Sequence, residues 1–297
     1  ILPEDHALCL GGAGLSPKAD QLLMPLIGQS DCILLLGYDP IEMRIGWRDP
    51  WGADQTVIEV TEVARTHGMH SVTHELRGSV APTLAALDAR IENAKPHWAD
   101  GAVEKLRADL RAVFTASGWG PGLVFQTLRE EMPPETVITA DSGAHRILLS
   151  QIWCCPGPRQ MLQSTALCTM ACAVPLAMGY KMGSDAPVMA FVGDAGLEMG
   201  LGELATLRDL ELPMIITVLV DESLALIELK QRGTQRPNLG VDFGGTDFPA
   251  VAEAMGGTGV WIDDEATLRV EAQKALARPG FTILACRIGR HAYDGTF

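Results

Sequence analysis

Two aspartates stand directly after neighbouring apolar runs in the second half of the chain. Asp194 follows the run at 188–193, Asp221 follows the run at 214–220, and a charged, helix-like stretch separates the two runs. The pattern predicts a strand–helix–strand unit whose parallel strands end at the same edge of a sheet. Ligands of open α/β sheets bind at that edge. Two carboxylates there supply hard oxygen ligands, which suit Mg²⁺ holding a phosphate group.

The residues around these aspartates resemble the cofactor motif of thiamine diphosphate (ThDP) enzymes of the acetolactate synthase-like family. The family motif is Gly-Asp-Gly or Gly-Asp-Ala, followed after a helical segment by Asn-Asn. Here it reads Gly193-Asp194-Ala195 and then Val220-Asp221, so Asp221 takes the place of the second, metal-binding Asn. A hydrophobic residue followed by Asp is similar to the FAD-free catabolic acetolactate synthases. The alternative is an ordinary βαβ unit with two solvated loop aspartates.

The resemblance implies a metal site and a phosphate site in this segment. Asp194, Asp221 and the main-chain carbonyl of Ser223 match the family's protein ligands of Mg²⁺. Two diphosphate oxygens and a water would complete the octahedron that Mg²⁺ requires. Ala195 and Gly196 match the turn whose N–H groups face the phosphate, and Gly196 replaces a common Ser. Residues that match positions flanking the cofactor or the substrate are Leu224, Ala225 and Leu226, the second of which replaces a usual Gly.

A second match follows the predicted strand 136–140. Asp-Ser-Gly-Ala-His at 141–145 stands where the family commonly has Asp-Val-Gly-Gln-His, whose backbone and His contact the diphosphate. The match implies a phosphate pocket lined by Ser142, Gly143, Ala144 and His145. A glycine turn that leads into a helix offers N–H donors to an anion, and an imidazole can add another donor. The alternative is that His145 is simply a polar residue at a helix start.

A third match covers residues 164–171, opposite the family's Gly-Gly-Leu-Gly-Thr-Met-Gly. By this match Met170 is the bulky residue under the thiazolium ring that keeps the cofactor bent. Cys168 and Ala171 stand where the family has Gly, so their side chains are expected to narrow the approach to the aminopyrimidine. We predict a helix over 168–182, with Cys168 and Cys172 one turn apart. The alternative assigns Met170 to plain helix core.

The composition excludes several classes of protein. The net charge of −14 disfavours a nucleic-acid partner, because phosphate binding needs a basic surface. No apolar run reaches the roughly 18 residues that a membrane span needs. The seven cysteines lack paired C-x-x-C zinc spacing. We interpret them as reduced core residues of a cytoplasmic protein that acts on small molecules.

Alternating strands and helices predict an α/β fold, with a mainly parallel sheet covered by helices on both faces. We assign 1–93 to the C-terminal part of a central Rossmann-like domain, 94–118 to a linker and 119–297 to a ThDP diphosphate-binding domain. The predicted strands are 31–39, 56–60, 136–140, 188–192, 214–220, 260–263 and 281–287. The predicted helices are 17–27, 79–92, 123–132, 168–182, 203–210, 224–232, 248–255 and 266–277, the first capped by Ser16.

The resemblance implies a ThDP- and Mg²⁺-dependent lyase or transferase that acts on 2-keto acids, with pyruvate decarboxylation and carboligation as the default activity. One alternative is a 2-keto acid decarboxylase of the same superfamily, and another is a degenerate homologue that does not catalyse. Residues 37–42 replace the Arg-Phe-Asp-Asp-Arg pattern of FAD-containing relatives, so we expect no FAD.

The resemblance also implies that half of the active site lies elsewhere. In the family, the activating Glu belongs to an N-terminal pyrimidine-binding domain, usually that of the neighbouring subunit, and no segment here resembles that domain. The chain begins at Ile1, and we expect it to be a fragment without a catalytic residue of its own. We therefore expect residues 1–297 to be inactive alone, and a homodimer or homotetramer with active sites between subunits.

Overall fold

The computed structural model describes residues 2–64, 67–92, 98, 100–165 and 167–297. The chain divides into two compact units, one of Gly12–Leu110 and one of Ile1–Gly11 with Arg111–Phe297. Positions 94–97 and 99 of the linker that we expect from the sequence lie outside the described residues. The three segments assigned above, and the two boundaries between them, stay predictions.

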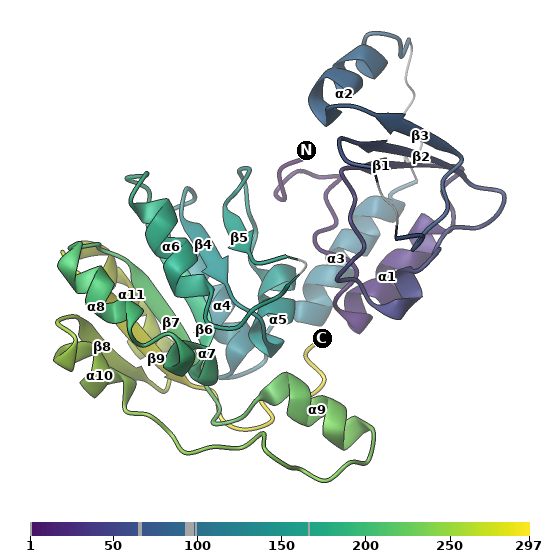
Figure 1. Ribbon diagram of the computed structural model, residues 1–297. Helices are drawn as coiled ribbons and strands as arrows, with labels where there is room; N and C mark the ends of the chain where they lie inside the picture. Colours follow the sequence, from purple (N-terminus) through teal and green to yellow (C-terminus); the bar gives the residue numbers. More distant parts are fainter. Residues whose placement is uncertain (1, 65–66, 93–97, 99, 166) are drawn as a thin grey trace. The chain divides into compact units, whose positions relative to one another are not determined.

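The smaller unit contains a parallel sheet of order β1-β2-β3 (Figure 1). Its strands are β1 Cys32–Leu36, β2 Thr56–Thr61 and β3 His74–Arg77, and its other elements are α1 Pro17–Ile27, the 3₁₀ helix η1 Ile45–Trp47 and α2 Val80–Asp88. Helix α1 begins as predicted, because Ser16 Oγ accepts the N–H of Ala19 and Pro17 takes the first helical position.

Helix α3, Ala102–Phe114, lies within the predicted linker. It buries Val103, Leu106, Leu110 and Phe114, which recur every three or four positions. This spacing places them on one helix face. The helical part of the predicted linker is therefore amphipathic. It begins in the smaller unit and ends in the larger one.

The larger unit contains a parallel sheet of order β5-β4-β6-β7-β9-β8 (Figure 1). The strands are β4 Val137–Ala140, β5 Met161–Gln163, β6 Val188–Gly193, β7 Ile215–Val220, β8 Thr258–Ile262 and β9 Thr282–Arg287. Strand β7 is buried at every position, and β6 at every position but the last. Strands covered on both faces read as continuous apolar runs, which is why these two were predictable.

Helices cover both faces of this sheet. The helices of this unit are α4 Pro121–Glu131, α5 Ala144–Ile152, α6 Ala173–Lys181, α7 Asp194–Met199, α8 Glu203–Asp209, α9 Ala225–Gly233, α10 Phe248–Ala254 and α11 Glu265–Ala277, of which α9 lies away from the sheet (Figure 1). On one face, buried residues of α6, α8 and α10 form a core with Ala190 and Ile216. On the other, the rings of Phe125 and Trp153 lie 5.4 and 5.5 Å from that of Phe191. The predicted α/β architecture is confirmed.

The prediction of a helix over 168–182 is wrong for residues 168–172. Helix α6 begins only at Ala173, with Cys172 at its N-cap. Cys168 and Ala171 have φ angles of 52° and 65°, in the left-handed region that a right-handed helix excludes. Cys168 and Cys172 therefore do not lie one helical turn apart. The apolar pattern of this segment fits a helix and a turn equally well, so the sequence does not reveal the difference.

The cysteines are core residues less often than we expected. All seven are free, but only Cys155 and Cys286 are buried, and Cys32 is exposed. Burial raises the pKa of Cys155 to about 12, with a further contribution from the charge of Glu4. A thiol of this kind stays protonated at neutral pH, so its role is packing.

The left-handed backbone at residue 171 leads to a stability prediction. A non-glycine residue costs about 1–2 kcal/mol there, and glycine avoids that cost while adding about 0.4–1 kcal/mol of unfolded-chain entropy. Ala171→Gly is therefore expected to raise the free energy of unfolding by about 0.5–1 kcal/mol, measured by urea denaturation. The control is Ala177→Gly within α6, expected to lower it by about 1 kcal/mol. A loss of stability in both variants would contradict the prediction.

Candidate functional site

A pocket with a volume of about 130 Å³ opens at the C-terminal ends of the central strands of the larger unit. It brings together residues from all three segments that the sequence singled out. Of the predicted residues, those lining it are Ser142, Gly143, Ala144, His145, Met170, Asp194, Ala195, Gly196, Asp221, Ser223, Leu224, Ala225 and Leu226. Cys168 is not among the lining residues, and its Sγ contacts Nη1 of Arg146 instead.

Four further residues line the pocket that our sequence reasoning did not assign to the site. Gly193, Leu219 and Ile227 adjoin predicted positions and could have been found by extending the motifs. Tyr293 comes from the C-terminal segment, where no motif marks it. Its side chain is 3% exposed, and burial, together with the charges of Asp221 and Asp194, raises its pKa well above the usual value. Tyr293 therefore stays protonated and forms a fixed wall.

The carboxylate of Asp194 is held by backbone N–H groups at the ends of β6 and β7. Its Oδ2 accepts from Asp221 at 3.1 Å and from Glu222 at 2.7 Å, and its Oδ1 accepts from Ala195 at 2.8 Å. The N–H of Ala195 is thus engaged by Asp194. Burial raises the pKa of Asp194, against the effect of these hydrogen bonds. The bonds fix the carboxylate next to the loop that carries Asp221.

Asp221 presents a buried oxygen without a hydrogen-bond partner. The residue is 5% exposed, and its Oδ1 accepts the N–H of Ser223 at 3.3 Å. Within the described chain, Oδ2 has no partner. Burial and then the charge of Asp194 raise the pKa of Asp221 to about 8. An unpaired buried carboxylate is costly, and a cation shared by the two carboxylates would remove that cost.

The ligand set suits a divalent cation only if other molecules complete it. Among the described residues, no group of three or more His, Cys, Asp or Glu is arranged to hold a metal ion. Asp194 and Asp221 therefore supply two ligands, and the remainder must come from main-chain oxygens, water or a bound anion. Mg²⁺ is commonly held in this way, by one or two carboxylates and phosphate oxygens. The residues present fit a metal–phosphate pair.

The N-terminus of α5 forms another part of the pocket wall. The first N–H groups of a helix have no partner within it, and no side chain caps this one. The N–H of Ser142 donates to the carbonyl of Thr169 at 3.1 Å, which leaves Gly143 and Ala144 to face an anion. A Cβ on Gly143 would lie 2.6 Å from the His145 ring, so glycine is needed for the ring to occupy this place.

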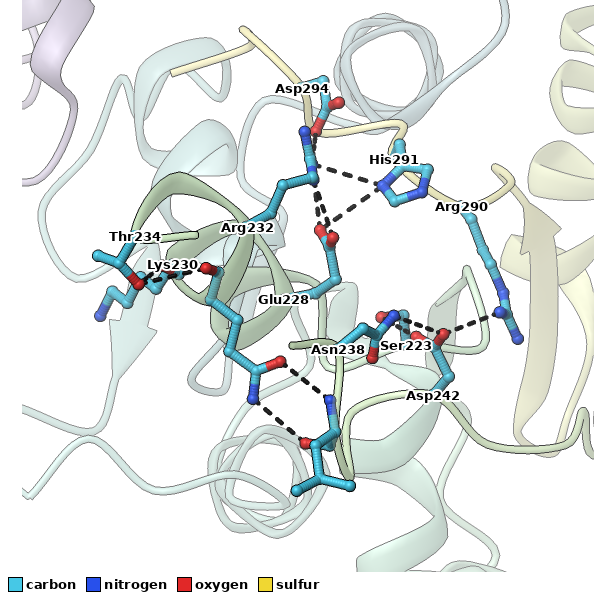
Figure 2. Close-up of polar contacts among 12 residues, drawn as sticks. Ser223, Glu228, Lys230, Arg232, Thr234, Asn238, Asp242, Arg290, His291 and Asp294 are labelled. Carbon is cyan, nitrogen blue, oxygen red and sulfur yellow. Dashed lines mark hydrogen bonds and ion pairs between the residues drawn. The ribbon is translucent and has the colours of Figure 1, made fainter. Parts of the chain in front are cut away.

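Polar contacts anchor the loop after β7 and the C-terminal segment beside the pocket, as Figure 2 shows. Ser223 Oγ donates to Asp242 at 3.1 Å, and Arg290 forms an ion pair with the same aspartate at 3.0 Å. Arg232 of α9 forms ion pairs with Glu228 at 2.8 Å and with Asp294 at 2.5 Å. Through Asp242, Arg290 is connected to the loop that carries Ser223. Through Arg232, Asp294 is connected to helix α9. The two residues lie on either side of Tyr293 in the sequence, so these contacts hold the segment that carries it.

The described residues contain no helix long and apolar enough to cross a membrane.

Residues 141–286 match the family model described as the thiamine pyrophosphate enzyme, C-terminal TPP binding domain. Thiamine pyrophosphate is the same compound as ThDP. The matched range includes the sequence-predicted site residues.

Curated proteins with similar sequences include acetolactate synthases. The chain is 27% identical over 254 residues to the acetolactate synthase of Bacillus subtilis (strain 168), covering 80% of this chain and 43% of that protein. It is 24% identical over 271 residues to the catabolic acetolactate synthase of Raoultella terrigena, covering 88% and 48%. The chain thus spans about half the length of the curated relatives it matches.

A solved structure shares the fold. The benzoylformate decarboxylase of Polynucleobacter necessarius superposes with a TM-score of 0.75 at 18% identity, over 98% of this chain and 54% of that one. The similarity supports a common α/β architecture.

Proposed function

We propose that this chain forms the diphosphate- and Mg²⁺-binding part of an acetolactate synthase-like enzyme that uses ThDP to act on 2-keto acids. The observation that carries the proposal is the charge of the pocket. Two buried aspartates line it, and among its lining residues in the described chain there is no lysine or arginine. A diphosphate would be repelled by these carboxylates unless a divalent cation lay between them.

In this proposal Asp194, Asp221 and the main-chain carbonyl of Ser223 hold Mg²⁺. The N–H groups at Gly143 and Ala144, with the ring of His145, contact the diphosphate. The matched family model and the acetolactate synthase relatives support ThDP as the anion, since the match includes these positions. When bound, ThDP supplies the electron sink for breaking the bond between a carboxylate and a keto carbon.

The remaining lining residues position the reacting end of the cofactor. Met170 lies in the turn before α6, and we assign it to the place under the thiazolium ring. Leu224, Leu226 and Ile227 give this part of the pocket an apolar lining. An apolar surface excludes water and strengthens the electrostatic interactions of the bound group. No FAD is required in this proposal, and the enzyme is a homodimer or homotetramer.

The test is pyruvate turnover by the complete natural protein with ThDP and Mg²⁺ and without FAD. Carbon dioxide and acetolactate are measured together, and both are expected, because the sequence relatives are synthases. Adding FAD is expected to change neither rate. Carbon dioxide with free aldehyde would instead assign a decarboxylase, in which a proton takes the place of the second keto acid. Absence of both products and of ThDP binding would contradict the proposal and leave a non-catalytic homologue.

A further inference from the structure

Asp141 contacts the pocket wall without lining the pocket. It follows β4 directly, and the residue is 1% exposed. Its Oδ1 lies 2.8 Å from Nε2 of His145, and its Oδ2 accepts the N–H of Ala171 at 2.8 Å. One carboxylate therefore connects the start of α5 with the turn that carries Met170.

The same carboxylate also lies against the turn after β6. A Cβ on Gly196 would be 2.3 Å from Oδ2 of Asp141, a separation that real Cβ atoms do not show. Glycine at 196 is thus a condition for Asp141 to hold its two contacts. The turn that carries Asp194 therefore lies closer to Asp141 than any side chain at position 196 would allow.

We propose that Asp141 is a positioning residue that sets the relative placement of His145, the Met170 turn and the Asp194 turn. This proposal rests on the proposed function only for the identity of the ligand, because the contacts of Asp141 are within the protein itself. In ThDP binding, Asp141 acts through the groups that it holds and touches no part of the cofactor.

Two physical effects follow from these contacts. The negative charge of a carboxylate 2.8 Å from Nε2 favours a proton on that nitrogen, although the two atoms do not meet hydrogen-bond geometry, so Nδ1 is the nitrogen left for a ligand. The bond from Ala171 anchors a residue whose φ of 65° is unfavourable for alanine. Without Asp141 the ring can rotate and the turn can relax, and both changes move groups that line the pocket.

The test replaces Asp141 with Asn, which keeps the shape but turns one acceptor into a donor. Asn removes the negative charge that favours a proton on Nε2, so the proton of His145 is expected to move to Nδ1. The side-chain ¹⁵N shifts of His145, assigned with His145→Gln, report this tautomer in the cofactor-free protein. ThDP affinity with Mg²⁺, measured by calorimetry on the complete protein, is expected to fall about 10- to 100-fold.

Two further variants make the test specific. Gly196→Ala places a methyl group against the same carboxylate, and it is expected to shift the same His145 signals. This variant provides the test if Asp141→Asn does not fold. Asp264→Asn changes an aspartate that caps α11, and it should alter neither readout.

The outcomes separate this inference from the proposed function. Absence of ThDP binding by the wild-type protein would contradict the proposed function, whereas the tautomer measurement would still decide on the Asp141 contacts. Unchanged His145 signals in both Asp141→Asn and Gly196→Ala would overturn the inference. So would an unchanged ThDP affinity in Asp141→Asn when the wild-type protein binds ThDP.

Discussion

Asp221→Ala is expected to abolish Mg²⁺-dependent ThDP binding while making the metal-free protein more stable. The variant removes one of two carboxylates in a pocket whose described lining contains no lysine or arginine, so the metal loses a charged ligand. Affinity should fall by more than roughly 100-fold, beyond the 10- to 100-fold typical of residues that only support a ligand. In the metal-free protein the variant removes a buried oxygen that has no partner, a gain of about 1–3 kcal/mol, which is expected to exceed the loss of the long 3.3 Å bond from the N–H of Ser223.

This pair of opposite effects distinguishes a ligand from a structural residue. Binding is measured by calorimetric titration of the complete protein with ThDP at fixed Mg²⁺, and stability by urea denaturation without metal. Asp221→Asn keeps an oxygen ligand and matches the family motif, so it is expected to retain weakened binding. Asp209→Ala changes an exposed aspartate and should change neither quantity. An Asp221→Ala protein that loses stability and still binds ThDP would contradict the metal assignment.

The strands that carry the site were predictable because their burial leaves a clear sequence signal. Strands β6 and β7 lie inside the sheet and are apolar almost throughout, so their ends at Asp194 and Asp221 could be located from sequence. Strand β3 is exposed at each position and β5 is only partly buried over three residues, and we predicted neither. Short strands without a buried face carry neither alternation nor an apolar run.

The site was predictable where residues adjoin a strand end and was missed where tertiary contacts place them. His145 and Ser223 follow strands closely, and both line the pocket. Tyr293 reaches the pocket from the C-terminal segment, where its neighbour Asp294 pairs with Arg232, far away in sequence. The role of Asp141 depends on the space beside Gly196, which no single-sequence pattern records. Sequence therefore located the motif positions, and the structure added the residues that support them.

Residues 1–297 alone are expected to show no turnover of 2-keto acids, even with saturating ThDP and Mg²⁺. Within the described lining, the titratable residues are His145, Asp194, Asp221 and Tyr293. In the proposed site the two aspartates bind the metal, Nε2 of His145 faces Asp141, and the raised pKa of Tyr293 keeps it protonated. No group remains to move a proton at the aminopyrimidine end. The resemblance assigns that step to a Glu on a pyrimidine-binding domain.

Supplying that domain is therefore expected to restore turnover, and replacing its Glu by Gln to remove it again. General acid–base groups contribute about 10²- to 10⁴-fold to rate, so the two states differ by at least that factor. The control is Asp221→Ala in the reconstituted protein, which should abolish turnover by loss of the metal. Turnover by residues 1–297 alone that disappears in Asp221→Ala would contradict the prediction, because it would place a complete proton pathway within this pocket. Metal-dependent ThDP binding without turnover would instead separate the two tasks, with the metal and diphosphate held here and the proton transferred from the other domain.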